Sequence, residues 1–505
     1  MSGDALKKEF GDYQTPDCFA KRVCLYLKNE LKIMPEYIFE PTAGIGNFIR
    51  AGIDCFGSVK KVYGVEINPE YCKMCESRFC GEKVSIVCDN FFNYDSTKLI
   101  QHDEEILVMG NPPWATNAEL NINLPEKANF KKLSGTDAIT GASNFDICEY
   151  IILKLIKEFN CTNTTIAMLC KTSVARNVLL ELERNDILTE YVKILNFDST
   201  KVFGINAAGC LLVIKLSQNG KKNDTCEIYD ISDSGKLIDT IKIKNGALST
   251  LQEGVLDLEG SCQLEWRQGV KHDCSNVMEL TQINHSMYLN KRKEVVELED
   301  KIVFPLVKSS MIKAPIINKN FIKYVIVTQK KAREDTSCIE HVAPKTWNYL
   351  QRNKMDFDGR KSSIYKGAPP FSMFGVGDYS YAPYKVAVSG FYKKPLFTLL
   401  YNVEKIQRAV MLDDTVYFIS FYDYDLAYAC MLLLNTAKVQ DFLYSISFQD
   451  AKRPYTKKVL QRLNLKKCME NVSLEDMESI EDGLKLKRYI SNEKYKKFSE
   501  YLNKI

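Results

Sequence analysis

The chain has 505 residues, 45% of them hydrophobic, and a formal net charge of only +4. This length predicts two to four domains, and so small a net charge indicates no class of partner by itself. The N-terminus contains no apolar signal stretch, and no apolar run of about 18 residues follows it, so we expect no membrane span. Without a secretory signal, the 17 cysteines are expected to be reduced in a cytoplasmic protein.

Strand and helix signals alternate through the first 215 residues. Repeated βα units predict an α/β fold with a doubly wound, mostly parallel Rossmann-like sheet, in which ligands bind at the carboxyl ends of the strands. Predicted strands cover residues 38–40, 62–67, 84–89, 105–110, 165–170, 192–197 and 207–216, and predicted helices cover 48–56, 69–79 and 146–159.

The pattern changes after residue 217, where a polar loop precedes a predicted hairpin at 226–246. From about residue 255 the βα alternation is lost. Between Lys308 and Lys366 there are thirteen Lys and Arg residues against five Asp and Glu, with aromatic residues interleaved. We therefore predict an α/β domain at 1–250 and a basic, mixed α+β domain at 251–505.

One cysteine group has spacing that could begin a zinc site, Cys72-x-x-Cys75 with Cys80 and Cys88. However, Cys72 and Cys75 fall in a predicted helix, and no second pair follows at the spacing of a zinc ribbon. Only four histidines are present. We interpret these cysteines as structural and predict no metal.

Polar residues close four successive strands. Glu40 precedes the small-residue turn Pro-Thr-Ala-Gly-Ile-Gly-Asn, Glu66 closes the second strand, Asp89 closes the third, and Asn111-Pro112-Pro113-Trp114 closes the fourth. Each alone is ordinary, a tight turn or an exposed strand-end acid. In this order they predict a nucleoside site, because a strand-end acid can accept hydrogen bonds from ribose. No P-loop is present, so a triphosphate is not expected.

Two adjacent prolines cannot continue a strand, because neither has an N–H for the ladder. The stretch Asn-Pro-Pro-Trp at 111–114 therefore predicts a stiff turn that presents an amide and an indole at the strand's end.

With these motifs, the chain resembles the amino-methylating, S-adenosylmethionine-dependent DNA methyltransferases whose cofactor motifs precede a C-terminal target recognition domain. The resemblance spans nearly the whole chain. It rests on GDYQTP, FEPTAGIGNF, VYGVEINP, VCDNF, GNPPW, SNFDICEYIILKL and KVFGINAAGCLLVIKL, and later on WRQGVKHDC, FPLVKSSMI, TWNYLQRN and FGVGDYSYAPYKVAVSGFYKK. It implies a catalytic domain at 1–250 and a DNA target recognition domain at 251–505.

The resemblance implies S-adenosylmethionine as the cofactor. Its methionine end would meet Thr15, Glu40, Thr42 and Ala43, Glu66 would bind the ribose, Ile67 would pack on the adenine, and Asp89 would accept from the adenine amino group. The implied contact residues are Tyr13, Thr15, Glu40, Thr42, Ala43, Gly44, Glu66, Ile67, Asp89, Asn90, Asn111 and Pro113. Asn90 stands where the family has an aromatic residue, which leaves open whether Phe91 or Phe92 covers the adenine.

The resemblance also implies the catalytic set Asn111, Pro112, Pro113, Trp114 and Phe203. The Asn111 oxygen and the Pro112 carbonyl would accept from the target amino group, while Trp114 and Phe203 would stack on a flipped base. Trp114 is expected to face an open cavity beside Glu66 and Asp89, and an indole sealed inside the hydrophobic interior would overturn this proposal. Packing in the core is the alternative for both rings.

Phosphate contacts from the basic second half would set affinity, and groove-reaching side chains would set specificity. The predicted DNA-binding residues are Lys271, Arg360, Lys361, Tyr379, Tyr381, Lys385, Lys452 and Arg453, although each alone is more typical of a solvated charge or a core tyrosine.

The predicted function is methylation of adenine N6 in double-stranded DNA within a prokaryotic restriction-modification system, by a monomer in the cytoplasm at the nucleoid. Any partner nuclease would be a separate chain. The alternatives are cytosine-N4 methylation, where serine more often replaces the asparagine, RNA adenine methylation, glutamine methylation of proteins, and a non-catalytic DNA-binding module.

Overall fold

The structure is a computed structural model that describes residues 13–99, 104–115, 146–217, 219–231, 236–250, 254–403 and 408–505. Gly11, Asp12 and residues 143–145 of the quoted motifs lie outside these ranges. The chain forms two compact units, Met1–Leu251 and Gln252–Ile505. Within the described ranges, no helix has the length and apolarity needed to cross a bilayer.

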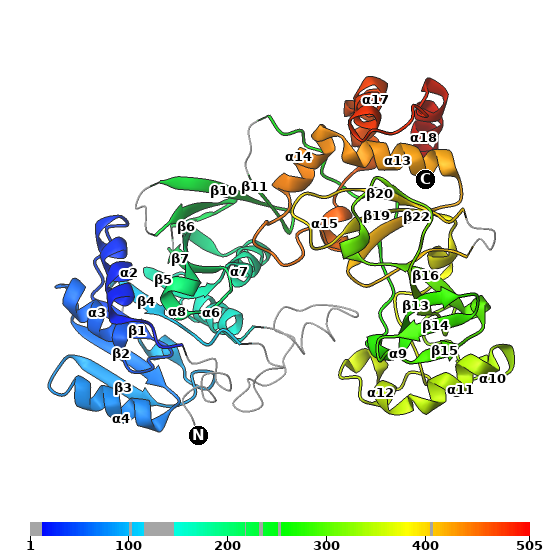
Figure 1. The fold of residues 1–505 in the computed structure, drawn as a ribbon. Coiled ribbons are helices and arrows are strands. Elements are labelled where there is room, and N and C mark those ends of the chain that lie inside the picture. The colour runs from blue at the N-terminus through cyan, green and yellow to red at the C-terminus, as the bar shows by residue number, and fades with distance from the viewer. Residues whose placement is uncertain are drawn as a thin grey trace. The chain divides into compact units, whose positions relative to one another are not determined.

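Unit 1 is built on an 11-stranded sheet in the order β11-β10-β9-β6-β7-β5-β4-β1-β2-β3, with β8 beside β6 (Figure 1). The pairs among β1 to β5 are parallel, whereas β7 is antiparallel to both β5 and β6. The strands are β1 (Tyr37–Glu40), β2 (Lys61–Glu66), β3 (Val84–Cys88), β4 (Ile106–Gly110), β5 (Thr164–Lys171), β6 (Leu188–Phe197), β7 (Gly209–Leu216), β8 (Lys221–Lys222), β9 (Thr225–Asp230), β10 (Leu237–Lys244) and β11 (Ala247–Thr250).

Helices cover both faces of this sheet, which confirms the doubly wound α/β class. Ile38 and Leu107 share a buried cluster with the helices α2 and α3, whereas the next residue of β1, Phe39, contacts Phe159 just after α6 at 6.3 Å between ring centroids. All five residues of β4 are buried, as expected for a central parallel strand. The helices are α2 (Asp17–Asn29), α3 (Asn47–Cys55), α4 (Pro69–Arg78), α6 (Ile147–Glu158), α7 (Thr172–Arg184) and α8 (Ser199–Phe203), with a 3-10 turn η1 at Ser96–Leu99.

Unit 2 contains two further sheets. One has five strands in the order β12-β22-β19-β20-β17, and the other has six in the order β15-β14-β13-β18-β16-β21. The strands are β12 (Arg267–Gln268), β13 (Glu279–Asn284), β14 (Met287–Asn290), β15 (Val295–Glu297), β16 (Val303–Val307), β17 (Ile316–Ile317), β18 (Lys323–Ile326), β19 (Tyr384–Ser389), β20 (Thr398–Leu400), β21 (Met411–Leu412) and β22 (Val416–Phe421).

Helices cover each of these sheets. The apolar helix α13 packs on the five-stranded sheet, and Tyr349 of α11 packs on the six-stranded one. The helices are α9 (Ser275–Met278), α10 (Ile339–Val342), α11 (Pro344–Arg352), α12 (Lys354–Asp358), α13 (Tyr424–Asn435), α14 (Ala437–Ser445), α15 (Lys457–Leu460), α16 (Leu465–Asn471), α17 (Leu474–Gly483) and α18 (Asn492–Lys504), with 3-10 turns η2 (Asp300–Ile302), η3 (Ser309–Met311), η4 (Ser363–Tyr365) and η5 (Asp378–Tyr381).

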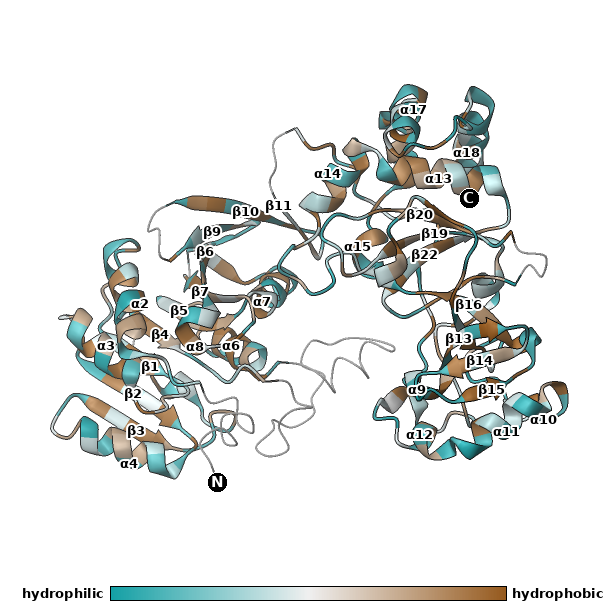
Figure 2. Cartoon of the chain, viewed as in Figure 1, coloured by the Kyte–Doolittle hydropathy of each residue, from teal (hydrophilic) through white to brown (hydrophobic). Residues whose placement is uncertain are grey.

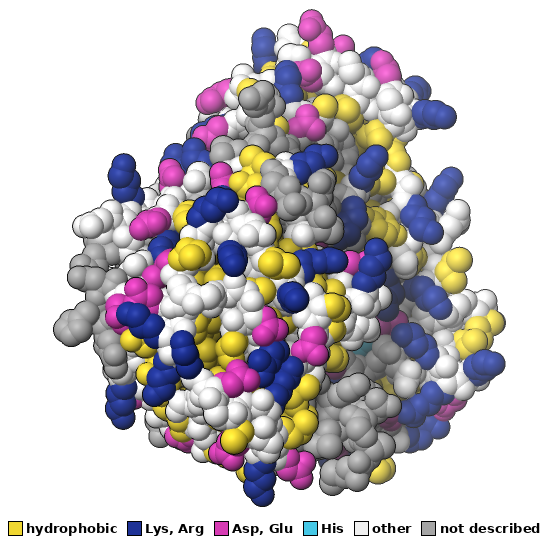
Figure 3. Space-filling model, turned by 90° about the vertical axis from the view of Figure 1, so that its left-hand side faces the viewer, with side chains coloured by type: hydrophobic (Ala, Val, Ile, Leu, Met, Phe, Trp, Pro, Cys, Tyr) yellow, Lys and Arg dark blue, Asp and Glu magenta, His cyan; other side chains and the backbone are white. Residues whose placement is uncertain are grey.

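Burial follows hydropathy in both units. The terminal helix α18 is largely hydrophilic (Figure 2), and its apolar residues Phe498 and Leu502 are the ones that are buried. On the face in Figure 3, lysine and arginine side chains are interspersed with acidic and apolar ones. This face therefore carries charges of both signs.

Candidate active site

A cavity of about 790 Å³ opens in unit 1 at the carboxyl ends of β1, β2, β3 and β4. This is the edge of a parallel sheet at which ligands bind. Every residue that the sequence predicts for the cofactor lines this one cavity: Tyr13, Thr15, Glu40, Thr42, Ala43, Gly44, Glu66, Ile67, Asp89, Asn90, Asn111 and Pro113. Gln14, Asn47, Phe48, Asn68, Tyr71, Ile147 and Ile151 also line it and were not predicted.

The turn between β1 and α3 requires its glycines. Gly44 and Gly46 have φ angles of +53° and +81°, in the left-handed region that favours glycine. A Cβ at Gly46 would lie 2.5 Å from a ring carbon of Phe79. The turn therefore brings backbone close to the cavity in a way that a residue with a side chain would disturb.

Glu66 is held firmly at the end of β2. One carboxylate oxygen accepts from the Gly44 amide at 2.7 Å and the other from the Asn68 amide at 2.8 Å. The side chain is only 8% exposed. Its orientation is therefore set by backbone donors before any ligand arrives.

Four buried polar atoms in the lining have no hydrogen-bond partner among the described residues. They are Thr15 Oγ1, Glu40 Oε2, Thr42 Oγ1 and Asn111 Oδ1. Buried polar groups are nearly always satisfied, so a cluster of unsatisfied ones around a cavity indicates a polar ligand. Burial, and then the nearby charge of Glu66, raise the pKa of Glu40 well above its usual range. A cationic ligand would compensate both effects.

The segment before α2 is fastened over the turn. The Asn47 amide donates to the Thr15 carbonyl at 2.8 Å, and the Ile45 amide donates to Gln14 Oε1 at 3.2 Å. Arg78 of α4 donates to the Ile45 carbonyl at 2.9 Å and to Asn47 Oδ1 at 2.6 Å. Neither Gln14 nor Arg78 was predicted, because their partners lie about thirty positions away in the chain.

The adenine end of the predicted site lies after β3. The Asp89 amide donates to the Glu66 carbonyl at 3.0 Å, which ties the ends of β2 and β3 together. Phe91 and Phe92 both line the cavity. Phe91 is buried against Phe39, whereas Phe92 is half-buried and keeps exposed ring surface. Of the two rings, Phe92 is the one that can cover a ligand.

Asn111 follows β4 with its amide already oriented. Its Nδ2 donates to the Tyr13 carbonyl at 2.8 Å, while Oδ1 is buried without a partner among the described residues. Pro113 lines the same cavity, and the buried Pro112 does not. The Asn111 side chain is thus held through its Nδ2, and its Oδ1 can accept a hydrogen bond from a ligand.

The expectation that Trp114 faces the open cavity is wrong. The indole is 9% exposed, belongs to a buried hydrophobic cluster and does not line the cavity. Its Nε1 donates to the Leu169 carbonyl at 3.3 Å, and its ring lies 6.4 Å from Phe197 and 5.7 Å from Phe203 between centroids. The indole packs in the buried apolar cluster on one side of the sheet. The predicted arrangement, in which the indole stacks at the cavity, is therefore overturned, whereas Asn111 does line the cavity.

Phe203, at the end of α8, belongs to the same aromatic group but is half-buried. Its ring also lies 6.3 Å from Phe19. It does not line the cofactor cavity. Among the rings of Phe19, Trp114, Phe197 and Phe203, it is the one with substantial exposed surface.

The predicted DNA-binding residues of unit 2 differ widely in exposure. Lys385 is 1% exposed and donates to the Ala382 carbonyl at 2.8 Å, so the prediction that it contacts DNA is wrong; β19 is buried on both faces. Arg360 donates to the carbonyls of Phe357, His272 and Ser372, which makes it a structural clamp.

The tyrosines in this set are half-buried. The Tyr381 hydroxyl donates to the Gln329 carbonyl at 3.2 Å, and the Arg267 guanidinium lies over the Tyr379 ring at 4.5 Å. Lys361 and Lys452 are exposed, while Lys271 and Arg453 are partly exposed. Lys271 lies 3.6 Å from Asp273 and Arg453 lies 3.7 Å from Asp414, so Lys361 and Lys452 are the more accessible basic residues of this set.

Fold and site together define an α/β methyltransferase with a nucleoside-type cofactor cavity. No family model matches the chain. The type II methyltransferase M.NspV of Nostoc sp. (strain ATCC 29411 / PCC 7524) is 39% identical over 475 residues, which are 92% of this chain and 97% of that protein. The chain therefore belongs to the type II methyltransferases, the S-adenosylmethionine-dependent class that its motifs predict.

Solved structures align weakly. A modification subunit of a putative type I restriction enzyme from Vibrio vulnificus YJ016 is 16% identical, with a TM-score of 0.31 over 46% of this chain and 49% of that one. The type IIG restriction endonuclease BpuSI is 13% identical, with a TM-score of 0.35 over 97% of this chain and 65% of that one. Scores this low carry no argument about function.

Proposed function

We propose that the protein methylates the N6 amino group of adenine in double-stranded DNA, using S-adenosylmethionine bound in the cavity of unit 1. The observation that carries the proposal is the Asn111 amide, fixed through its Nδ2 to the Tyr13 carbonyl with Oδ1 buried and unpartnered among the described residues. An oriented acceptor beside a cofactor cavity is suited to an N–H donor on a substrate.

The protein supplies orientation and charge compensation. Asn111 Oδ1 and the Pro112 carbonyl accept from the two hydrogens of the target amine, which favours a pyramidal nitrogen and offsets the positive charge that develops there. Proline fixes φ, so this pair of acceptors needs little reorganisation. S-adenosylmethionine, when bound, supplies the electrophilic methyl group.

The cavity lining suits that cofactor. The unsatisfied oxygens of Thr15, Glu40 and Thr42 line the same cavity as Asn111 and would meet the cationic methionine end. Glu66 would bind the ribose, and Ile67 and Phe92 would enclose the adenine, with Asp89 accepting from its amino group.

A target base inside a duplex must be flipped out to reach this site. Phe203 is the half-buried ring next to Trp114 and would stack on the flipped base, with the buried indole in edge contact behind it. Unit 2 would act as the target recognition domain and contact DNA phosphates through exposed Lys361 and Lys452. The protein would act as a monomer, and a cognate nuclease would be a separate chain.

The test is to incubate the protein with radiolabelled S-adenosylmethionine and, separately, double-stranded DNA, RNA or protein, and then to digest the labelled product to nucleosides. The proposal expects N6-methyl-2′-deoxyadenosine from DNA. Label in N4-methyl-2′-deoxycytidine would change the target base but keep the same acceptor chemistry, because both amines are exocyclic. Label only in RNA or protein would overturn the proposal.

A further inference from the structure

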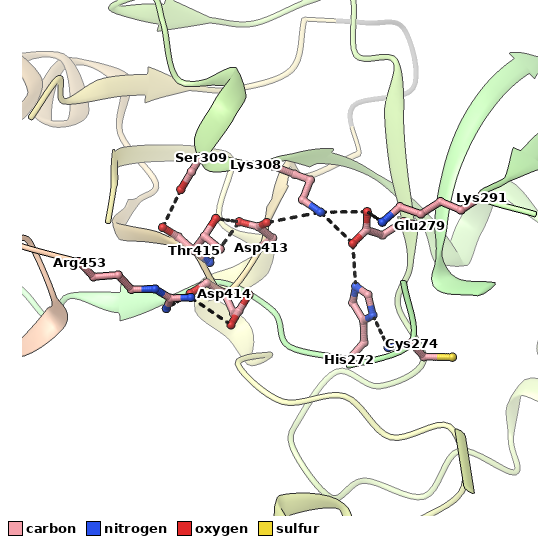
Figure 4. A network of polar contacts seen from close by, with 10 residues as sticks. All are labelled: His272, Cys274, Glu279, Lys291, Lys308, Ser309, Asp413, Asp414, Thr415 and Arg453. Atoms are coloured by element: carbon pink, nitrogen blue, oxygen red, sulfur yellow. Dashed lines mark hydrogen bonds and ion pairs between the residues drawn. The ribbon is translucent and has the colours of Figure 1, made fainter. Parts of the chain in front are cut away.

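Unit 2 contains a second, polar cavity of about 570 Å³, lined from β13, the turn after β16 and the loop before β22. Its lining is Val270, Lys271, His272, Asp273, Ser275, Glu279, Lys308, Ser309, Ser310, Phe391, Asp413, Asp414 and Thr415. Polar and charged side chains predominate, and the network that they form is shown in Figure 4. No part of the cofactor chemistry uses these residues.

The floor of this cavity is buried and rigidly connected. The side chains of His272, Glu279 and Asp413 are 7%, 9% and 8% exposed. His272 Nδ1 accepts from the Cys274 amide at 3.1 Å, which places the ring proton on Nε2, 3.6 Å from Glu279. Burial alone would raise the pKa of Glu279, but hydrogen bonds from Lys291 and Lys308 outweigh it and lower this pKa. Glu279 is thus a fixed carboxylate.

The rim is partly exposed, and Lys308 connects it to this floor. The side chains of Lys308 and Asp414 are 32% and 35% exposed. Lys308 Nζ donates to the two oxygens of Glu279 at 2.9 and 3.0 Å, while Asp413 lies at 3.7 Å, beyond hydrogen-bond length. Asp414 lies 3.7 Å from Arg453. Lys308 therefore keeps a third ammonium hydrogen for a ligand, and the Asp414 carboxylate, paired with Arg453 only at 3.7 Å, keeps acceptor capacity in the same cavity lining.

The charge balance argues for base edges over phosphates. The lining holds two lysines against four acidic residues, so a phosphate would meet an excess of negative charge. Each acid has a basic partner: Lys271 for Asp273, Lys308 and Lys291 for Glu279, Lys308 for Asp413 and Arg453 for Asp414. In the described part of the chain no cluster of His, Cys, Asp or Glu is placed to hold a metal ion. A neutral ligand with both donors and acceptors fits best.

We propose that this rim reads a G·C base pair in the major groove of the substrate DNA, with Lys308 donating to guanine O6 and N7 and Asp414 accepting from the cytosine N4 amino group. Lysine and aspartate are the side chains suited to these two edges. The inference rests on the proposed function, since it assigns the specificity of the same methyl transfer. Neither Lys308 nor Asp414 is among the individual DNA-binding residues that the sequence predicts.

The test uses the full chain, first mapping its methylated positions on genomic DNA. Duplexes with that site, and with each G·C pair replaced by A·T, are then bound in the presence of S-adenosylhomocysteine. In Lys308→Gln the preference for G·C over A·T at one particular pair is expected to fall about ten- to one-hundredfold. Asp414→Asn is expected to lower the preference at that same pair. Lys291→Gln is the matched control, because Lys291 also binds Glu279, at 2.9 Å, but does not line the cavity. Its specificity should match the wild type.

Three results would overturn the inference: a mapped site without any G·C pair, a Lys308→Gln protein that binds all duplexes equally more weakly, or a loss of preference in Lys291→Gln equal to that in Lys308→Gln. If Lys308→Gln does not fold, the isosteric Asp414→Asn variant decides alone, and unchanged preference there overturns the inference. Failure of the proposed function looks different, because the wild type would then methylate no DNA at all.

Discussion

The Trp114→Ala substitution distinguishes a role of the indole in core packing, which would appear as lost stability, from a role in stacking on the base, which would appear as lost DNA binding. The indole is 9% exposed, contacts Phe197 and Phe203, and donates to the Leu169 carbonyl. Truncation of a buried tryptophan to alanine costs about 3–5 kcal/mol. For a unit of this size that corresponds to a fall of roughly 6–20 °C in the unfolding midpoint. Trp114→Phe keeps much of the packing and should lose less.

The assay is thermal unfolding of the full chain with and without S-adenosylhomocysteine, because the transition that the ligand shifts is that of unit 1. Phe203→Ala is the comparison. Its ring is half-buried, so we expect a smaller shift in the midpoint. The loss of DNA affinity should be about 5- to 150-fold, since stacking on a base is worth about 1–3 kcal/mol. An unchanged midpoint in Trp114→Ala together with lost DNA binding would refute the core assignment.

Three further predictions concern backbone and buried charge. Gly46→Ala should lower the free energy of unfolding by about 2–5 kcal/mol, because a left-handed φ costs about 1–2 kcal/mol and the clash with Phe79 adds an overpacking cost. Gly81 also has a positive φ but has open space around it, so Gly81→Ala should cost only the roughly 1–2 kcal/mol of the backbone conformation. Denaturant unfolding measures both. The affinity for S-adenosylmethionine should rise with pH until the raised pKa of Glu40 is passed, because the cationic cofactor favours the charged carboxylate. Calorimetry in two buffers should show that protons are released on binding, and Glu40→Gln should remove the pH dependence. Burial lowers the pKa of Lys385 to about 7 in the folded protein. Between about pH 7 and the usual lysine range the unfolded chain therefore binds more protons than the folded one, so the free energy of unfolding should rise with pH across this window. Lys385→Met should abolish this rise in thermal melts.

The cofactor half of the site was predictable because it depends on chain order. In a parallel sheet the strand ends converge at one edge, so Glu40, Glu66, Asp89 and Asn111 had to meet there once β1 to β4 were recognised. The predicted hairpin is also confirmed by the antiparallel pair of β9 and β10. Helices α2 and α7 were not predicted, and the antiparallel insertion of β7 is a pairing that alternation alone does not reveal.

The features that could not be predicted from the sequence depend on contacts between residues far apart in the chain. Nothing local to Trp114 shows that Phe197 and Phe203 cover it, since they lie over eighty positions away. Lys385 looked like a surface charge because a lysine in a strand is usually exposed, yet β19 is central in its sheet and buried on both faces. Lys308 and Asp414 are brought together only by the tertiary fold of unit 2.

The most direct test is the single-turnover rate of methyl transfer to DNA by Asn111→Ala, measured beside the dissociation constant for S-adenosylmethionine. If the buried amide oxygen grips the target amine, the rate should fall about 10²- to 10³-fold, as for loss of one preorganised polar group in other active sites, while cofactor affinity changes only severalfold. Transfer at the wild-type rate by this variant would contradict the account.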